Sequence, residues 1–92
     1  MEKEFVNKLA NVIRSFQEDL RQHLPALERE VNQRIRSKES NTNTIEHLLD
    51  TLLSLTMMGV GDELFFKLLG YYRTLDEEGA DFYSEEYYKE NE

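Results

Sequence analysis

TIEHLLDTLLSLTMM at residues 44–58 and ELFFKLLGYYRTL at residues 63–75, joined by GVGD, hold most of the Leu, Met and Phe of this 92-residue chain. In the first arm the apolar residues recur at steps of three and four, the spacing of one helix face. They are Ile45, Leu48, Leu49, Leu52, Leu53 and Leu55. In the second arm two apolar stripes run side by side, which favours a helix covered on more than one side. The pattern predicts a helical hairpin over 45–75, with the rest of the chain as its cover.

Local signals place the ends of this hairpin. Asn43 and Thr44 are rival N-caps, so the first arm is expected to start within a residue of 44. It is expected to end at Gly59, and Asp62 is a suitable N-cap for a second arm that runs from Glu63. We interpret Gly70, which lies inside that arm, as a point where a neighbouring helix approaches closely.

Residues 1–36 predict a long helix that bends near Pro25. Its apolar positions alternate steps of four and three, as in the seam of a helix that packs along another helix. They are Val6, Leu9, Ile13, Phe16, Leu20, His23 and Leu27. Proline removes a backbone donor and crowds the preceding turn. Either one helix kinks here or a second helix begins with Pro25 in its first turn, and the sequence leaves both open.

The length of this segment predicts self-association. A continuous helix over 2–36 would be about 50 Å long, whereas each arm of the hairpin would reach only about 20 Å. The surplus stripe must either fold back at Pro25 or be covered by a second copy. We expect a homodimer whose contact includes Ile13, Phe16, Leu20 and Leu27.

The remaining segments are a loop over 37–44 and an acidic stretch over 76–92 that contains three of the five tyrosines. The aromatic residues argue against a disordered tail, and a short helix is predicted from Ala80 to Tyr88. Tyrosines among carboxylates are typical of a contact surface for a basic partner. The expected contact residues are Asp81, Tyr83, Glu85, Glu86, Tyr87 and Tyr88. The alternative is that these rings pack back onto the hairpin.

Charge is distributed unevenly along the chain. Residues 1–75 carry ten Lys or Arg against eleven Asp or Glu, whereas residues 76–92 carry one against eight. Direct nucleic-acid binding is not expected, because it normally requires a basic patch. An acidic helical protein can instead mimic nucleic acid and inhibit a protein that handles DNA or RNA. Acid confined to the tail makes this mimic the second choice.

No catalytic or cofactor motif is present. The chain has no cysteine, and Gly59-Val60-Gly61 is too short for a phosphate-binding loop. His47 and Asp50 share a helix face, but two ligands do not make a metal site. We expect neither enzymatic activity nor a cofactor nor a metal. The start MEKEF lacks the features of a signal peptide, no apolar run could cross a membrane, and a cytoplasmic location is expected.

Together these patterns predict a single all-α domain over 1–92, with three main helices, the first one long and bent, and a short acidic helix at the end. The expected function is a non-enzymatic protein–protein interaction module, a small homodimeric adaptor or accessory protein.

Overall fold

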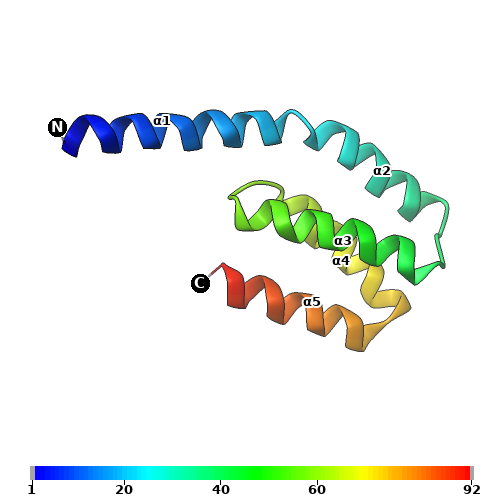
Figure 1. Ribbon diagram of the computed structural model, residues 1–92. Helices are drawn as coiled ribbons and strands as arrows, with labels where there is room; N and C mark the ends of the chain where they lie inside the picture. The colour runs from blue at the N-terminus through cyan, green and yellow to red at the C-terminus, as the bar shows by residue number, and fades with distance from the viewer. Residues whose placement is uncertain (1, 92) are drawn as a thin grey trace.

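The computed structural model describes residues 2–91, and over them the regular secondary structure is all α-helix, without a strand (Figure 1). Five helices follow one another in this part of the chain. They are α1 (Glu2–Arg21), α2 (Leu24–Arg36), α3 (Thr42–Met57), α4 (Asp62–Leu75) and α5 (Glu77–Glu90). The predicted all-α class and the helical bundle are confirmed.

The hairpin of α3 and α4 forms the centre of the protein. Its two helices make the most extensive backbone contact of any pair, and their apolar faces supply most of the core. Ile45, Leu49, Leu52, Phe65 and Leu68 have no solvent-exposed surface. The hairpin prediction therefore holds in its essentials.

The predicted N-cap of α3 is wrong. The side-chain Oδ1 of Asn41 accepts hydrogen bonds from the backbone N–H groups of Asn43 and Thr44, at 3.0 and 3.4 Å. The helix therefore begins at Thr42, two residues earlier than expected. Asn41 is the N-cap because its backbone is extended, as an N-cap requires, whereas Asn43 and Thr44 already lie within the helix.

At the tight connection, α3 ends at Met57, and Gly59 follows with a φ of 84° that favours glycine. The N-cap of α4 is Gly61 rather than Asp62, also in the left-handed region, so the side chain of Asp62 is free for another contact. The prediction for Gly70 is also wrong. A Cβ added there would have no atom within 4 Å, because Gly70 faces solvent.

The first segment is broken at Gln22 and His23, which form a turn, and α2 begins with Pro25 in its first turn. Proline lacks the N–H that a helix start leaves unbonded, so it is tolerated there. The chain bends at this turn but does not fold back (Figure 1). The apolar stripe is split as a result: Leu27, Val31 and Ile35 of α2 pack on the core, while α1 continues away from it.

The last helix is not short. Asp76 is extended and its carboxylate accepts a hydrogen bond from the Gly79 N–H at 2.9 Å, so α5 starts at Glu77 instead of Ala80. With 14 residues it equals α4 in length, and it packs along α4 and α3. The prediction of three main helices and a short one is therefore wrong. The acidic helix α5 is a full member of the bundle, because it buries Ala80 and Tyr83.

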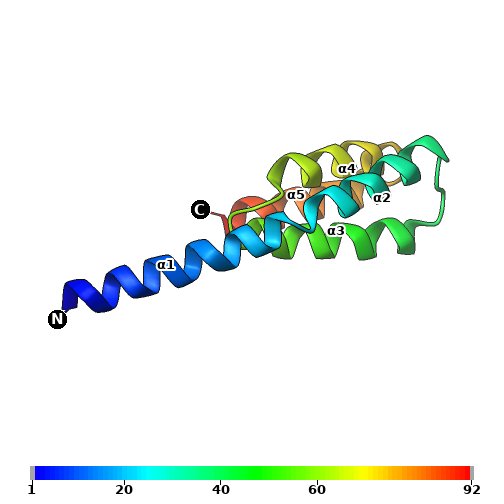
Figure 2. The ribbon, with the colours of Figure 1, turned by 90° about the horizontal axis from the view of Figure 1, so that it is seen from above.

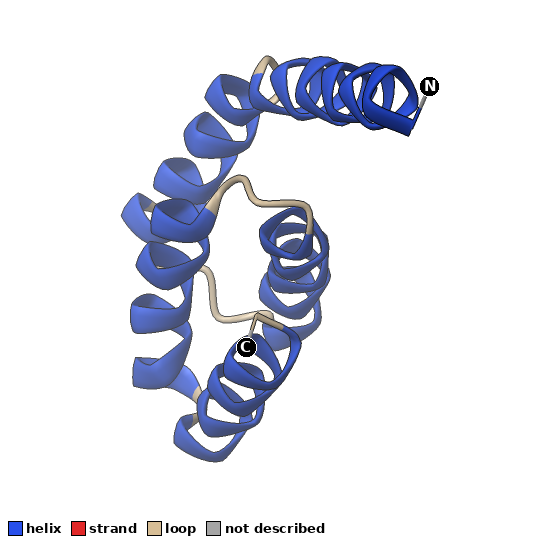
Figure 3. Ribbon diagram, turned by 90° about the vertical axis from the view of Figure 1, so that its left-hand side faces the viewer, coloured by secondary structure: helices blue, strands red, loops and turns tan. Residues whose placement is uncertain are grey.

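Helix α1 stands apart from the others. Besides α2, which follows it directly, no helix makes extended contact with α1. It runs on beyond the end of the bundle (Figure 2), and a view toward the amino end shows it beside the remaining helices rather than among them (Figure 3). The protein is correspondingly elongated, measuring 54 × 26 × 17 Å. We call residues 2–38 the arm and residues 39–91 the body.

Candidate functional site

Two inward-facing tyrosines join helices of the body through carboxylates. The Tyr72 hydroxyl donates to Glu46 and the Tyr83 hydroxyl donates to Asp50, both at 2.8 Å. The two rings meet edge to face, with centroids 5.8 Å apart. Burial, followed by these hydrogen bonds, raises the pKa of both hydroxyls, because a phenolate would lie in a poorly solvated place next to a carboxylate. These tyrosines fasten α4 and α5 to α3.

Tyr87 has the same kind of role at the other end of α5. Its hydroxyl donates to Asp62 at 2.6 Å, and this hydrogen bond is the main reason that its pKa is raised. The ring stacks on Phe65, with centroids 5.5 Å apart, and meets Phe66 edge to face. Asp62, which the Gly61 cap leaves free, therefore acts as the hydrogen-bond acceptor for a tyrosine from α5.

The predicted partner-binding residues thus separate into two groups. Tyr83 is only 7 % exposed and Tyr87 is half-buried, so these rings pack back onto the hairpin, as the alternative interpretation held. Asp81, Glu85 and Tyr88 face solvent.

Glu86 is half-buried, and Asp81 forms an exposed ion pair with Arg73 at 2.6 Å. Phe82, which is not among the predicted contact residues, is 57 % exposed on the same helix. The outer surface of α5 is therefore acidic, with two exposed aromatic rings, Phe82 and Tyr88.

The apolar face of α1 is the largest uncovered apolar feature of the described chain. Six of its side chains are between 49 and 68 % exposed. They are Phe5, Val6, Leu9, Val12, Ile13 and Phe16, and we call them, with Leu20, the α1 face. At 100° per residue all seven fall within an arc of about 120°. Single exposed apolar residues are normal, but a continuous patch of this kind marks an interaction site.

The residues predicted for self-association lie in different surroundings. Ile13 and Phe16 are half exposed in the α1 face, Leu20 is partly covered near the turn, and Leu27 packs against the core. Sequence reasoning missed Phe5 and Val12, which lie along one edge of the same face. The two residues are seven positions apart, which places them on one helix face. The predicted seam took only two positions per heptad and therefore excluded them.

Charge separates between the arm and the body. The arm contains eight Lys or Arg and six Asp or Glu, a net charge of +2. The body contains three Lys or Arg and twelve Asp or Glu, a net charge of −9. Acid is therefore spread over α3, α4 and α5 and is not confined to the tail.

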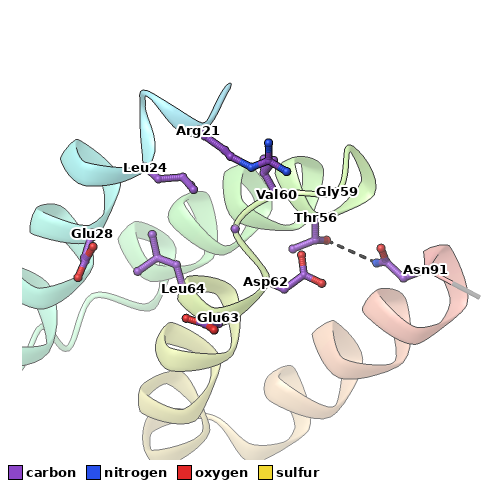
Figure 4. A pocket seen from close by; sticks show the side chains of 11 residues that line it. Arg21, Leu24, Glu28, Thr56, Gly59, Val60, Asp62, Glu63, Leu64 and Asn91 are labelled. Carbon is purple, nitrogen blue, oxygen red and sulfur yellow. Dashed lines mark hydrogen bonds between the residues drawn. The ribbon is translucent and has the colours of Figure 1, made fainter. Parts of the chain in front are cut away.

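An open hollow of about 500 Å³ lies where the turn after α1 passes the α3–α4 connection (Figure 4). Arg21, Leu24, Asp62 and Asn91 are among its lining residues. The one buried side-chain nitrogen or oxygen found without a partner in the described chain, Arg34 Nε, does not line it. No feature of the hollow therefore selects a ligand.

Within residues 2–91, no three His, Asp or Glu side chains lie close enough together to hold a metal ion. Over the same residues, no helix has both the length and the apolar character needed to cross a bilayer.

Comparison with known proteins adds no relative. No protein-family model, curated protein or solved structure matches this chain. The α1 face and the acidic body are therefore the features of the molecule that point to a function.

Proposed function

We propose that this protein is a non-enzymatic protein–protein interaction module that forms a homodimer through α1 and presents its acidic body to another protein. The observation that carries the proposal is the uncovered α1 face. Six side chains about half to two thirds exposed offer roughly 600 Å² of apolar surface, at about 100 Å² each. A stable interface buries about 800 Å² on each partner, so this face with its polar edges is of the required size.

A second copy of the chain fits this face better than the body of the same chain does. The turn at Gln22 and His23 directs α1 away from the body, so α1 cannot lie along its own core without a large rearrangement of that turn. A second α1 offers an equally long and equally apolar face. The dimer then carries two acidic bodies, the form of a bivalent adaptor for a partner with a basic surface.

On the body, the proposed contact is the outer surface of α5. Asp81, Glu85 and Tyr88 combine charge with aromatic area, and Phe82 adds a second exposed ring. Glu86 contributes at the edge, whereas Tyr83 and Tyr87 support the helix from within. A basic partner would be attracted by the carboxylates and held by the rings.

Light scattering after size exclusion, at two protein concentrations and two salt concentrations, tests the homodimer directly. The expected result is a mass twice that of the 11.0 kDa chain, retained at high salt because the contact is apolar. A single-chain mass at every concentration would refute self-association.

A nucleic-acid mimic remains the second candidate, favoured by one observation: twelve carboxylates against three basic residues in the body. A mimic would inhibit a DNA- or RNA-handling protein, and its binding would weaken steeply between low and physiological salt. A contact centred on Phe82 and Tyr88 would lose much less over the same range. Titration of a captured partner at several salt concentrations separates the two.

A further inference from the structure

We infer that the two copies pair through α1 in an antiparallel sense, about a two-fold axis that passes near Val12 and Ile13. The inference deepens the proposed homodimer and rests on it. It goes further by fixing where the two acidic bodies lie, namely at opposite ends of the paired helices. Four features of the chain carry it: the spacing of the α1 face, the charges along one edge of that face, the surroundings of its carboxyl-terminal end, and the charge of the body.

The α1 face has a spacing that reads the same in both directions. Three pairs of apolar residues lie at equal distances in sequence on either side of the midpoint between residues 12 and 13. They are Phe5 with Leu20, Leu9 with Phe16, and Val12 with Ile13. In an antiparallel pair centred there, each of these six residues lies level with an apolar residue of the partner.

Val6 is the exception, since it lies level with the partner's Asp19. These two residues occupy opposite edges of the face, and an antiparallel pair brings like edges together. The carboxylate is therefore not placed against Val6.

One edge of the face carries complementary charges in this arrangement. Lys8 and Asp19 lie on the same edge, some 20° apart at 100° per residue, and both are exposed. Reversal of the second helix brings Lys8 within two residues, or about 3 Å along the axis, of the partner's Asp19. The two-fold axis repeats this ion pair, so the edge contributes two attractive contacts.

The ends of the helices also meet apolar surface. Gln17 Nε2 donates to the Met58 carbonyl at 2.9 Å, which holds the α3–α4 connection beside the last turns of α1. Met57 and Met58 are 49 % and 45 % exposed there. The amino end of an antiparallel partner, with the partner's Phe5 level with Leu20, arrives next to these flexible side chains.

The charge of the body disfavours the parallel alternative. Parallel helices would place two bodies of net charge −9 side by side. Antiparallel helices place the bodies at opposite ends of the pair, and their near ends, which reach the level of Gln17, lie about 13 Å apart along the axis. That distance exceeds the Debye length of about 8 Å at physiological salt, and most of the two bodies lies farther apart, so the repulsion is largely screened.

Cysteine cross-linking in the 92-residue chain tests the orientation, because this chain contains no cysteine. Lys8→Cys and Asp19→Cys are prepared separately, mixed and oxidised. The expected result is a disulfide-linked dimer from the mixture and none from either variant alone. In a dimer of either variant alone, the two copies of the cysteine would be at least nine residues apart along the helix axis, about 13 Å. This distance exceeds the reach of a disulfide.

Leu9→Cys supplies the opposite signature. In a parallel pair the two copies of this residue face each other and cross-link, whereas in the antiparallel pair they are about 10 Å apart along the axis and do not. Self-linked Leu9→Cys without a mixed Lys8→Cys and Asp19→Cys product would overturn the orientation while leaving the homodimer in place. Light scattering of the reduced samples distinguishes that outcome from a failure of the dimer itself, which would overturn both.

Discussion

The double substitution Ile13→Ala and Phe16→Ala tests the α1 face most directly. Ile13 is 51 % exposed and Phe16 is 50 % exposed, so about half of each side chain remains to be buried by the partner. Complete burial of an Ile or Phe side chain contributes about 1.5 to 3 kcal/mol, so each half contributes about 1 kcal/mol. The dimer contains four such side chains. The expected loss is about 4 kcal/mol of association free energy, roughly a thousandfold increase in Kd.

Sedimentation equilibrium over a wide concentration range measures this Kd. The matched control is Asn11→Ala and Glu18→Ala, two exposed positions on the opposite side of α1. Alanine is the best helix former, so neither variant weakens α1 itself, and circular dichroism checks that the helix content is unchanged. An unaltered Kd for the double variant, or an equal loss in the control, would refute the assignment of this face as the dimer contact.

Three further predictions concern the body, each read from urea unfolding curves. Gly70→Ala should raise the free energy of unfolding by about 0.5 to 1 kcal/mol, since its Cβ would meet open space inside a helix; a decrease would contradict the open surroundings of this residue. Gly79→Ala should lower it, because its Cβ would collide with the Tyr72 hydroxyl, and a neutral result would mean that the start of α5 shifts freely. The free energy of unfolding should be retained up to about pH 10 and fall above it. Burial raises the pKa of Tyr72 and Tyr83 in the folded state above the ordinary value of about 10, so deprotonation above that pH favours the unfolded state. A flat alkaline profile would count against their burial.

Substitution at Tyr88 tests the proposed surface of α5. Tyr88→Ala should weaken partner capture without lowering the melting temperature much, since the ring is 60 % exposed. Tyr83→Ala, in the same helix, should instead lower the melting temperature, because its ring is in the core and its hydroxyl binds Asp50. If both variants behaved alike, the division of α5 into an outer contact face and an inner packing face would be incorrect.

The acidic segment shows where sequence reasoning reached its limit. The mixture of aromatic and acidic residues predicted a contact surface, with packing against the hairpin as the alternative, and the structure shows that Tyr83 and Tyr87 pack against the hairpin. Tyr83 and Tyr87 find carboxylates on α3 and α4, residues 33 and 25 positions away in the chain, and no local pattern announces such pairs. The same holds for Asp62: the N-cap position predicted for it is occupied by Gly61, and its carboxylate accepts a hydrogen bond from the distant Tyr87 hydroxyl.

The sequence by itself determined the helices and their apolar faces, because side-chain spacing and backbone preference are local properties. It also determined that the first segment is too long for two short arms to cover. Only the tertiary structure decided which part of the apolar stripe in this first segment is left uncovered. The turn at Gln22 and His23 keeps α2 on the core and directs α1 outward, so the uncovered face falls entirely on α1. The physical reason is that the direction of the chain after a break depends on contacts with residues distant in the sequence: α2 packs on the core through Leu27, Val31 and Ile35, whereas α1 continues away from it.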